Sequence, residues 1–177
     1  MANALTRNPT NPNPLHPNKF QLNFARSPSL QFFCQSVTFP GISLSEIPRN
    51  TPFIDIYSPG EKATYDLLNV TFVVDEELKG WFEIHDWIRG LTFPEKFEEY
   101  QRLKQLSPLS DKNFPQFSDA AITILDSAQK PTYRIKFVDC FPISISSIVF
   151  AATDDPNSIV TADASFRFSY FDIDKLF

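Results

Sequence analysis

Few residues of this 177-residue sequence have the types and spacing that nucleotide chemistry needs. Phosphate binding by a P-loop or a dinucleotide fingerprint requires a glycine-rich turn whose backbone amides approach the phosphate closely. The four glycines, Gly41, Gly60, Gly80 and Gly90, are all isolated from one another. Neither motif is therefore present, and the sequence implies no nucleotide cofactor.

The two histidines are the natural candidates for acid–base chemistry. His16 lies in a proline-rich segment, and His85 lies in the helical pattern Glu83-Ile84-His85-Asp86-Trp87. Successive helical residues do not face one another, so Glu83 and Asp86 cannot both chelate a metal together with His85. Aromatic neighbours favour a structural role for His85. A small enzyme or ligand-binding module that uses His85 remains an alternative, because sequence does not exclude a catalytic arrangement assembled in space.

The acidic pairs Glu76-Glu77 and Glu98-Glu99 could supply the two carboxylates of a glycosidase. Adjacent acids on a helix more often solvate its exposed face, and we favour that interpretation.

The two cysteines, Cys34 and Cys140, lie far apart in the sequence. They lack the clustered spacing of a zinc site and the density of a disulfide framework, so we expect two buried thiols. Taken with the histidines and acidic pairs, this predicts no catalytic residues, no metal site and no enzyme activity.

The elements that would position these residues are mainly strands. Residues 1–17 are rich in proline and asparagine and predict an extended arm that becomes ordered only against a partner. A single domain is predicted over 18–177. Its alternating apolar residues predict strands at Phe20–Phe24, Leu30–Phe39, Ala63–Val74, Ala120–Asp126, Tyr133–Asp139, Ile143–Phe150 and Val160–Ile173.

A helical insert is predicted between the two sets of strands, over about 75–106. Asp75 is the expected N-cap, an apolar stripe runs from Leu78 to Leu91, and Gly90 is the expected stop. A second short helix is predicted from Pro94 to Leu106. Strands joined by short turns favour antiparallel pairing, so the predicted fold is mainly β: an antiparallel β-sandwich or barrel with a flanking helix and this second short helix.

The charge is concentrated in one region. The net charge is -5, and residues 75–99 alone contain eight acidic and three basic residues. This region is either a solvated helix face or an acidic surface that meets a basic partner or repels a passing polyanion. The net charge disfavours general attraction to nucleic acid. No stretch has the length and apolarity of a membrane helix, so we expect no membrane insertion by this chain.

The segment from Pro48 to Lys62 combines prolines with apolar alternation. Prolines on both sides predict a projecting loop or hairpin rather than a central strand. Apolar residues on a projecting element predict burial against another subunit. The predicted contact residues are Pro48, Arg49, Phe53, Ile54, Ile56, Tyr57, Glu61 and Lys62.

Several segments, taken in order, resemble the tail tube family of contractile-tailed bacteriophages. The resemblance covers most of the chain after residue 18. Its segments are Asn18-Lys19-Phe20-Gln21-Leu22, Phe32-Phe33-Cys34-Gln35-Ser36-Val37, Phe39-Pro40-Gly41-Ile42, Glu46-Ile47-Pro48, Pro59-Gly60-Glu61-Lys62, Val74-Asp75-Glu76, Phe82, Asp86-Trp87, Cys140-Phe141-Pro142-Ile143-Ser144 and Phe166-Arg167-Phe168-Ser169-Tyr170.

The resemblance implies a non-enzymatic virion protein of the phage tail, assembled in the host cytoplasm. It would form stacked hexameric rings of the inner tail tube, inside the tail sheath and beside other tail proteins. The inner strands would join into a continuous barrel, and DNA would pass through the lumen during ejection without specific binding. The segment from Pro48 to Lys62 would reach the adjacent ring.

Two departures from a plain tube subunit imply an alternative within the same family. The arm before residue 18 is long, and the acidic second helix enlarges the insert. Both fit a terminal ring with the tube fold, either at the head-proximal end of the tail or at the start of the tube on the baseplate.

Overall fold

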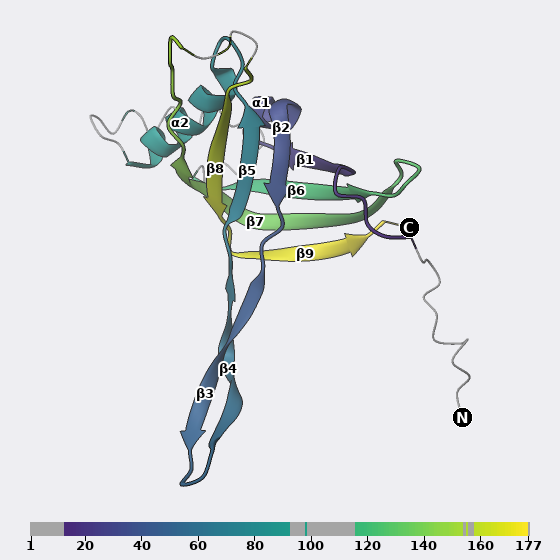
Figure 1. Ribbon diagram of the computed structural model, residues 1–177, viewed down its shortest axis with the longest axis vertical. Coiled ribbons are helices and arrows are strands. Elements are labelled where there is room, and N and C mark those ends of the chain that lie inside the picture. The colour runs from purple at the N-terminus through teal and green to yellow at the C-terminus, as the bar shows by residue number, and fades with distance from the viewer. Residues whose placement is uncertain (1–12, 93–97, 99–115, 154, 156–157, 177) are drawn as a thin grey trace.

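Antiparallel strands dominate the computed structural model, which describes residues 13–92, 98, 116–153, 155 and 158–176 (Figure 1). No helix among these residues is long and apolar enough to cross a membrane. The elements are β1 (Phe20–Phe24), α1 (Pro28–Phe33), β2 (Cys34–Thr38), β3 (Ile42–Asn50), β4 (Asp55–Tyr65), β5 (Leu68–Val73), α2 (Lys79–Thr92), β6 (Ser118–Leu125), β7 (Pro131–Ile145), β8 (Thr161–Arg167) and β9 (Tyr170–Lys175).

Two crossed layers of strands form the body. The ladder order is β1-β6-β7-β8-β5-β2, with β9 added on β7, and every pairing is antiparallel. In Figure 1, β1, β6, β7 and β9 run across β8, β5 and β2, which is the orthogonal arrangement of a sandwich. The predicted antiparallel, mainly β fold with a flanking helix is confirmed.

The long strand β7 belongs to both layers. Its first half pairs with β6 and β9, and its second half pairs with β8. Ile135 and Phe137 are buried in the first half, whereas Cys140 and Pro142 are buried in the second. Asp139, whose φ is 55°, lies between them and shifts the alternation by one residue. This irregularity lets one strand turn its core side toward the interior in both layers.

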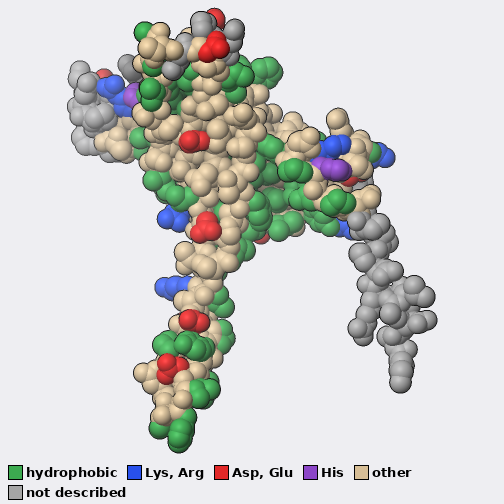
Figure 2. Space-filling model, in the orientation of Figure 1, with side chains coloured by type: hydrophobic (Ala, Val, Ile, Leu, Met, Phe, Trp, Pro, Cys, Tyr) green, Lys and Arg blue, Asp and Glu red, His purple; other side chains and the backbone are tan. Residues whose placement is uncertain are grey.

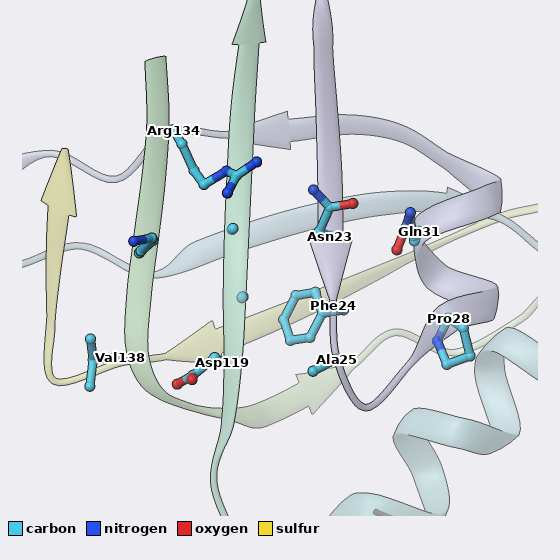
Figure 3. Close-up of a pocket in the computed structure, with 11 residues that line it drawn as sticks. Asn23, Phe24, Ala25, Pro28, Gln31, Asp119, Arg134 and Val138 are labelled. Atoms are coloured by element: carbon cyan, nitrogen blue, oxygen red, sulfur yellow. The ribbon is translucent and has the colours of Figure 1, made fainter. Parts of the chain in front are cut away.

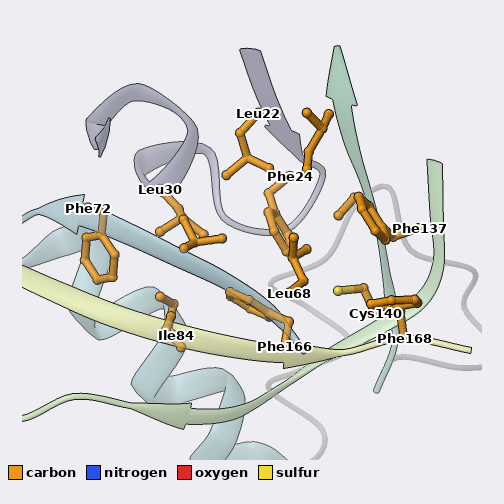
Figure 4. Close-up of a cluster of buried hydrophobic side chains, with 14 of the residues drawn as sticks. Leu22, Phe24, Leu30, Leu68, Phe72, Ile84, Phe137, Cys140, Phe166 and Phe168 are labelled. Carbon is orange, nitrogen blue, oxygen red and sulfur yellow. The ribbon is translucent and has the colours of Figure 1, made fainter. Parts of the chain in front are cut away.

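The core lies between the layers and under α2. Phe166 is fully buried, with its ring centroid 4.7 Å from that of Phe24 and 6.3 Å from that of Trp87. Figure 4 shows Phe24 and Phe166 among the apolar side chains that converge from several elements. The Trp87 indole N–H donates to the carbonyl of Gln116 at 3.1 Å, so the buried ring keeps its polar atom satisfied.

The helices differ from the prediction at three points. Pro28–Phe33 is the helix α1, whereas the sequence predicted one strand over Leu30–Phe39; Pro28 in the first turn favours a helix start there. Helix α2 begins at Lys79 rather than just after Asp75, because Leu78 has a φ of 55°. The Asp75 carboxylate still accepts from the Gly80 N–H at 3.4 Å.

Helix α2 also continues past the predicted stop at Gly90 to Thr92. The buried stripe of α2, which includes Ile84 and Trp87, follows the predicted spacing. The second helix predicted from Pro94 to Leu106 lies almost wholly outside the described residues, and so do residues 1–12 of the arm predicted over 1–17.

Four predicted strands have other limits in the structure. Tyr133–Asp139 and Ile143–Phe150 were predicted as two strands, but β7 is continuous to Ile145 and residues 146–150 form none. Ala63–Val74 is interrupted between β4 and β5, and Val160–Ile173 is interrupted between β8 and β9.

Candidate assembly surfaces

The projecting element is a long antiparallel hairpin, formed by β3 and β4 and called the hairpin below (residues 42–65). The prediction of a projecting hairpin is correct, although the element begins before Pro48 and ends after Lys62. Figure 1 shows it extending far beyond the sandwich as a continuation of the β2–β5 pair. Apolar side chains gather toward its end in Figure 2.

All eight predicted contact residues lie on the hairpin. Phe53 at the tip is 94% exposed, and Ile54, Ile56 and Tyr57 are also exposed. The sequence prediction missed three further exposed apolar residues on β3, namely Ile42, Leu44 and Ile47. Their alternation with polar residues was a usable signal, but they precede the proline that was taken as the boundary.

The two faces of the outer hairpin differ in chemistry. The register pairs Arg49 with Ile56 and Pro48 with Tyr57. Side chains alternate along a strand, so Arg49 and Ile56 share one face, while Pro48 and Tyr57 share the other. Neither face is wholly polar, and a partner would therefore have to cover both.

A bulge divides the hairpin. The register shifts between Leu44 and Glu46, opposite Gly60. A Cβ atom at Gly60 would lie 2.6 Å from the Ser45 carbonyl oxygen, so the close approach of the two strands requires glycine. Pro59-Gly60 lies inside β4, and the hairpin turns at Thr51–Ile54.

Aromatic contacts anchor the root of the hairpin to the body. Phe39 lies 5.3 Å from Phe171 between ring centroids, and Tyr65 lies 5.5 Å from the same ring. The Asp66 N–H donates to the Gly41 carbonyl at 3.1 Å, which ties the two strands together where they leave the sandwich. The hairpin is thus fixed at its base and exposed along its length.

The candidate residue His85 contacts two of its neighbours on α2. The His85 ring stacks on Trp81 with centroids 5.1 Å apart, and its Nδ1 lies 3.1 Å from Asp86 Oδ1. Glu83 instead accepts a hydrogen bond from the Ser29 hydroxyl at 2.7 Å. No group of three or more His, Cys, Asp or Glu side chains in the described part of the chain could hold a metal ion.

The cysteines are both free thiols, but only Cys140 is buried. Cys34 is half-buried, which corrects the expectation of two buried thiols; it begins β2, at a sheet edge. Burial raises the pKa of the Cys34 thiol to about 11, and burial followed by the nearby Asp119 charge raises the pKa of Cys140. Neither is an activated nucleophile.

The outward face of β1, β6, β7 and β9 is polar and slightly hollow. An open depression of about 670 Å³ lies over it, with Asn23, Gln31, Asp119 and Arg134 among its lining residues (Figure 3). Lys136 forms an ion pair with Asp174 of β9 at 2.6 Å. Basic side chains in the middle of this face are thus accompanied by acidic ones, and the face has no uniform charge.

Two strands of this sheet have a ladder on one side only. Among the described residues, β1 pairs with β6 and β9 pairs with β7, so each leaves one edge open. A hollow of about 510 Å³ runs beside β1, between it and β2. Ile173 of β9 is 57% exposed although it is paired with the buried Ile135. Open edges with exposed apolar side chains are typical of strands that pair with another chain.

A crossed β-sandwich with open sheet edges and an apolar projecting hairpin is typical of a protein that assembles with other chains. The chain belongs to the phage tail tube protein family, whose model matches residues 10–174. It is a structural component of the virion tail.

Comparisons with individual proteins give the same fold. The sequence is 27% identical over 145 residues to the tail tube terminator protein of Enterobacteria phage T4, covering 80% of this chain and 76% of that protein. The sheath/tube terminator of the PVC extracellular contractile injection system has a TM-score of 0.62 at 17% identity, covering 92% of this chain and 97% of that one. The tube terminating cap of the anti-feeding prophage has a TM-score of 0.61 at 16% identity, covering 99% of both chains.

Proposed function

We propose that this protein forms a terminal ring that ends the tube of a contractile phage tail. The observation that carries the proposal is the similarity to the T4 tail tube terminator, which extends over four-fifths of this chain. This favours the terminal-ring alternative over the repeating tube subunit that the sequence resemblance placed first. The proposed role is assembly without catalysis, so His85→Gln should leave ring formation and tail completion intact.

The proposed ring is a hexamer closed by strand pairing between β9 of one protomer and β1 of the next. Three antiparallel steps separate β1 from β9, so the two strands run in opposite directions. Rotation about a ring axis preserves strand direction relative to that axis, so β9 meets the neighbouring β1 in antiparallel orientation. The exposed Ile173 would be covered by this pairing, and the polar face would line the lumen.

The mixed charge of that polar face suits a DNA conduit. Lys136 is paired with Asp174, and the strand register places Arg134 opposite the same acidic residue. Basic side chains that already have acidic neighbours gain little free energy by binding DNA phosphates, because counterion release depends on basic charge that is not yet neutralised. DNA would therefore pass without specific binding. The hairpin would dock on the last ring of the tube.

Copy number separates a terminal ring from a repeating subunit. Quantitative mass spectrometry of purified tails should find this chain at a small fraction of the abundance of the main tube protein. Immunogold labelling should place it at one end of the tail. An abundance equal to that of the main tube component, with label along the whole tail, would overturn the proposal.

Two variants separate ring closure from docking on the tube. Ile173→Asp should leave a folded protein that no longer forms rings, because a charge would then face the core side of the β9–β1 pairing. Phe53→Asp together with Ile56→Asp should leave rings intact but prevent their binding to tube ends. Native mass measurement and negative-stain electron microscopy distinguish the two defects, and tube binding by the hairpin variant would contradict the docking role.

A further inference from the structure

The edge strand β9 and the root of the hairpin meet at one aromatic cluster, which we call the root cluster (Phe39, Tyr65, Phe168 and Phe171). The Phe171 ring lies 5.3 Å from Phe39, 5.5 Å from Tyr65 and 6.1 Å from Phe168 between centroids. Phe39 precedes β3, and Tyr65 ends β4. Both strands of the hairpin therefore contact β9 through the same side chain. Figure 1 shows β9 beginning beside the point where the hairpin leaves the body.

Further contacts connect the hairpin root to the start of β9. Phe168 lies in the short connection from β8 to β9, and its ring centroid is 5.6 Å from that of Tyr65. The Arg167 guanidinium donates to the Tyr65 carbonyl at 3.2 Å. A displacement of Tyr65 would therefore reach β9 directly through Phe171 and also through the connection that precedes the strand.

Beyond the root cluster, β9 is held on the sheet by its ladder with β7. Among the described residues it has no second ladder. Phe171 is half-buried, whereas the other apolar side chains of β9 are exposed. The ion pair between Lys136 and Asp174 is open to water, and such pairs stabilise little. The packing of Phe171 therefore has a large influence on whether β9 stays ordered at the sheet edge.

The residue proposed to pair with the next protomer lies two positions from Phe171. The register places Phe171 opposite Phe137 and Ile173 opposite Ile135, and both partners on β7 are buried. Because side chains alternate along a strand, Phe171 and Ile173 share the inward face of β9, about 7 Å apart. Phe171 contacts the hairpin root, whereas Ile173 is exposed. One face of a single strand thus serves both the hairpin and the proposed ring contact.

We propose that the root cluster couples docking of the hairpin to closure of the ring. In the free chain the hairpin is an unsupported two-stranded ribbon, and its local opening would loosen Phe39 and Tyr65 around Phe171. Docking would hold the root in place, order β9 and present Ile173 for pairing. Coupling between two binding events is reciprocal, so ring closure would also strengthen docking. The inference rests on the proposed terminal-ring function, and the coupling concerns the position of β9 rather than the stability of the core.

Amide hydrogen exchange of the single full-length chain tests the coupling without any ring or tube. Phe39→Ala removes a ring that contacts Phe171 from the hairpin side of the cluster. It should raise the exchange rate of the β9 amides by about threefold to tenfold, as expected for the loss of one aromatic pair. The amides of β6, which has a paired strand on each side, should exchange as in the wild type. Phe171→Ala should raise β9 exchange at least as much.

The matched control is Phe32→Ala on α1, which removes an 83% exposed aromatic outside the root cluster and should leave β9 exchange unchanged. Phe39→Tyr keeps the ring and should behave as the wild type does. Equal β9 exchange in the wild type and Phe39→Ala would overturn the inference, whatever the result for Phe171→Ala. If Phe39→Ala also raises exchange in β6, Phe39→Leu, which keeps apolar bulk without the ring, is judged by the same criterion.

Ring closure in the presence of tubes gives a second test. Purified tubes that lack this chain are mixed with wild-type or Phe39→Ala chain, and hexamers are counted by native mass measurement and negative-stain electron microscopy. Tube ends should lower the concentration at which wild-type rings close by about fivefold or more, and Phe39→Ala should lose most of this shift. Wild-type closure that is independent of tubes would overturn the coupling. A chain that neither closes rings nor binds tube ends contradicts the proposed function instead, and the exchange result then still decides whether the hairpin root controls β9.

Discussion

The β2–β5 pair and the hairpin form one continuous two-stranded ribbon. Its apolar side chains are buried in the body and exposed in the hairpin. In the part within the body, Leu68, Val70 and Phe72 are fully buried. In the hairpin, Ile42 and Leu44 continue this alternation, Ile47 follows beyond the bulge, and all three are exposed. The difference is the second layer, since β8, α2 and the crossed sheet cover only the upper part of the ribbon (Figure 1). Alternation therefore predicts the pleat of a strand, while burial depends on what packs against it.

The uncovered half of the ribbon has a thermodynamic consequence. A two-stranded hairpin by itself is marginally stable in water, because it buries little apolar area against the entropy of ordering the chain. The apolar side chains of the hairpin thus contribute little to the free energy of folding of the isolated protein. Their contribution comes on assembly, when a partner covers them.

The largest expected effect is a contrast between one aromatic in each region. Phe166→Ala should reduce the free energy of unfolding by about 4 kcal/mol, because it opens a cavity beside Phe24 and Trp87. Phe53→Ala should change it by less than about 0.5 kcal/mol, because the side chain is almost fully exposed. Urea unfolding of both purified variants measures the difference. Similar losses in the two would contradict the view that the hairpin is energetically separate from the body.

The same contrast explains what the sequence could predict. Prolines around Phe53 revealed a projecting element because they are incompatible with a central strand. The sequence also predicted two strands, Tyr133–Asp139 and Ile143–Phe150, where β7 is one strand whose buried positions shift by one residue between Phe137 and Cys140. A one-residue irregularity at Asp139 produces that shift, and the left-handed conformation of a non-glycine residue has no clear sequence signal.

The exposed apolar residues of the β7–β8 loop were missed for a related reason. Val149 and Phe150 end the segment Ile143–Phe150, which was predicted as a strand, yet β7 ends at Ile145 and no strand includes them among the described residues. Their position beside a polar turn was the available signal, as at the hairpin tip. Pairing with a distant strand is a property of the fold, so local pattern alone could not decide it.

A pair of glycine substitutions should sharpen the separation between the two regions. Gly60→Ala should disrupt the hairpin, because its Cβ would lie within 2.6 Å of the Ser45 carbonyl oxygen. Gly80→Ala is the matched control in the body, where a Cβ would lie 3.6 Å from the Phe72 ring, an ordinary contact distance. Because alanine favours helix, Gly80→Ala should be neutral or stabilise by up to about 1 kcal/mol.

Amide hydrogen exchange and thermal melting should distinguish the two glycine variants. In Gly60→Ala, the amides of β3 and β4 should exchange faster while the melting temperature of the body changes little. In Gly80→Ala, exchange in the hairpin should match the wild type. A cooperative loss of body stability in Gly60→Ala would show that the hairpin supports the sandwich.

The smallest expected effect concerns the carboxylate of Glu83, which is partly buried in the body, whereas the charged side chains of the hairpin are exposed. Burial raises the pKa of Glu83, and the hydrogen bond from Ser29 opposes that shift. Glu83 Oε2 is buried without a hydrogen-bond partner in the described residues. A raised pKa in the folded state means that folding favours the protonated form. The stabilisation that protonated Glu83 gives the folded state is therefore complete below the usual carboxyl pKa. It is lost as the pH rises through the raised pKa of the folded state.

Glu83→Gln removes this titration, so the stability of the variant relative to wild type should increase from about pH 4 to about pH 7. Ser29→Ala should enlarge the pH dependence of the wild-type carboxyl, because it removes the hydrogen bond that holds the pKa down. Urea unfolding across this range measures both differences. A stability difference between Glu83→Gln and wild type that does not vary with pH would show that water reaches the carboxylate. The α1–α2 contact would then be as open to solvent as the hairpin, and the contrast between the two regions would not extend to charged groups.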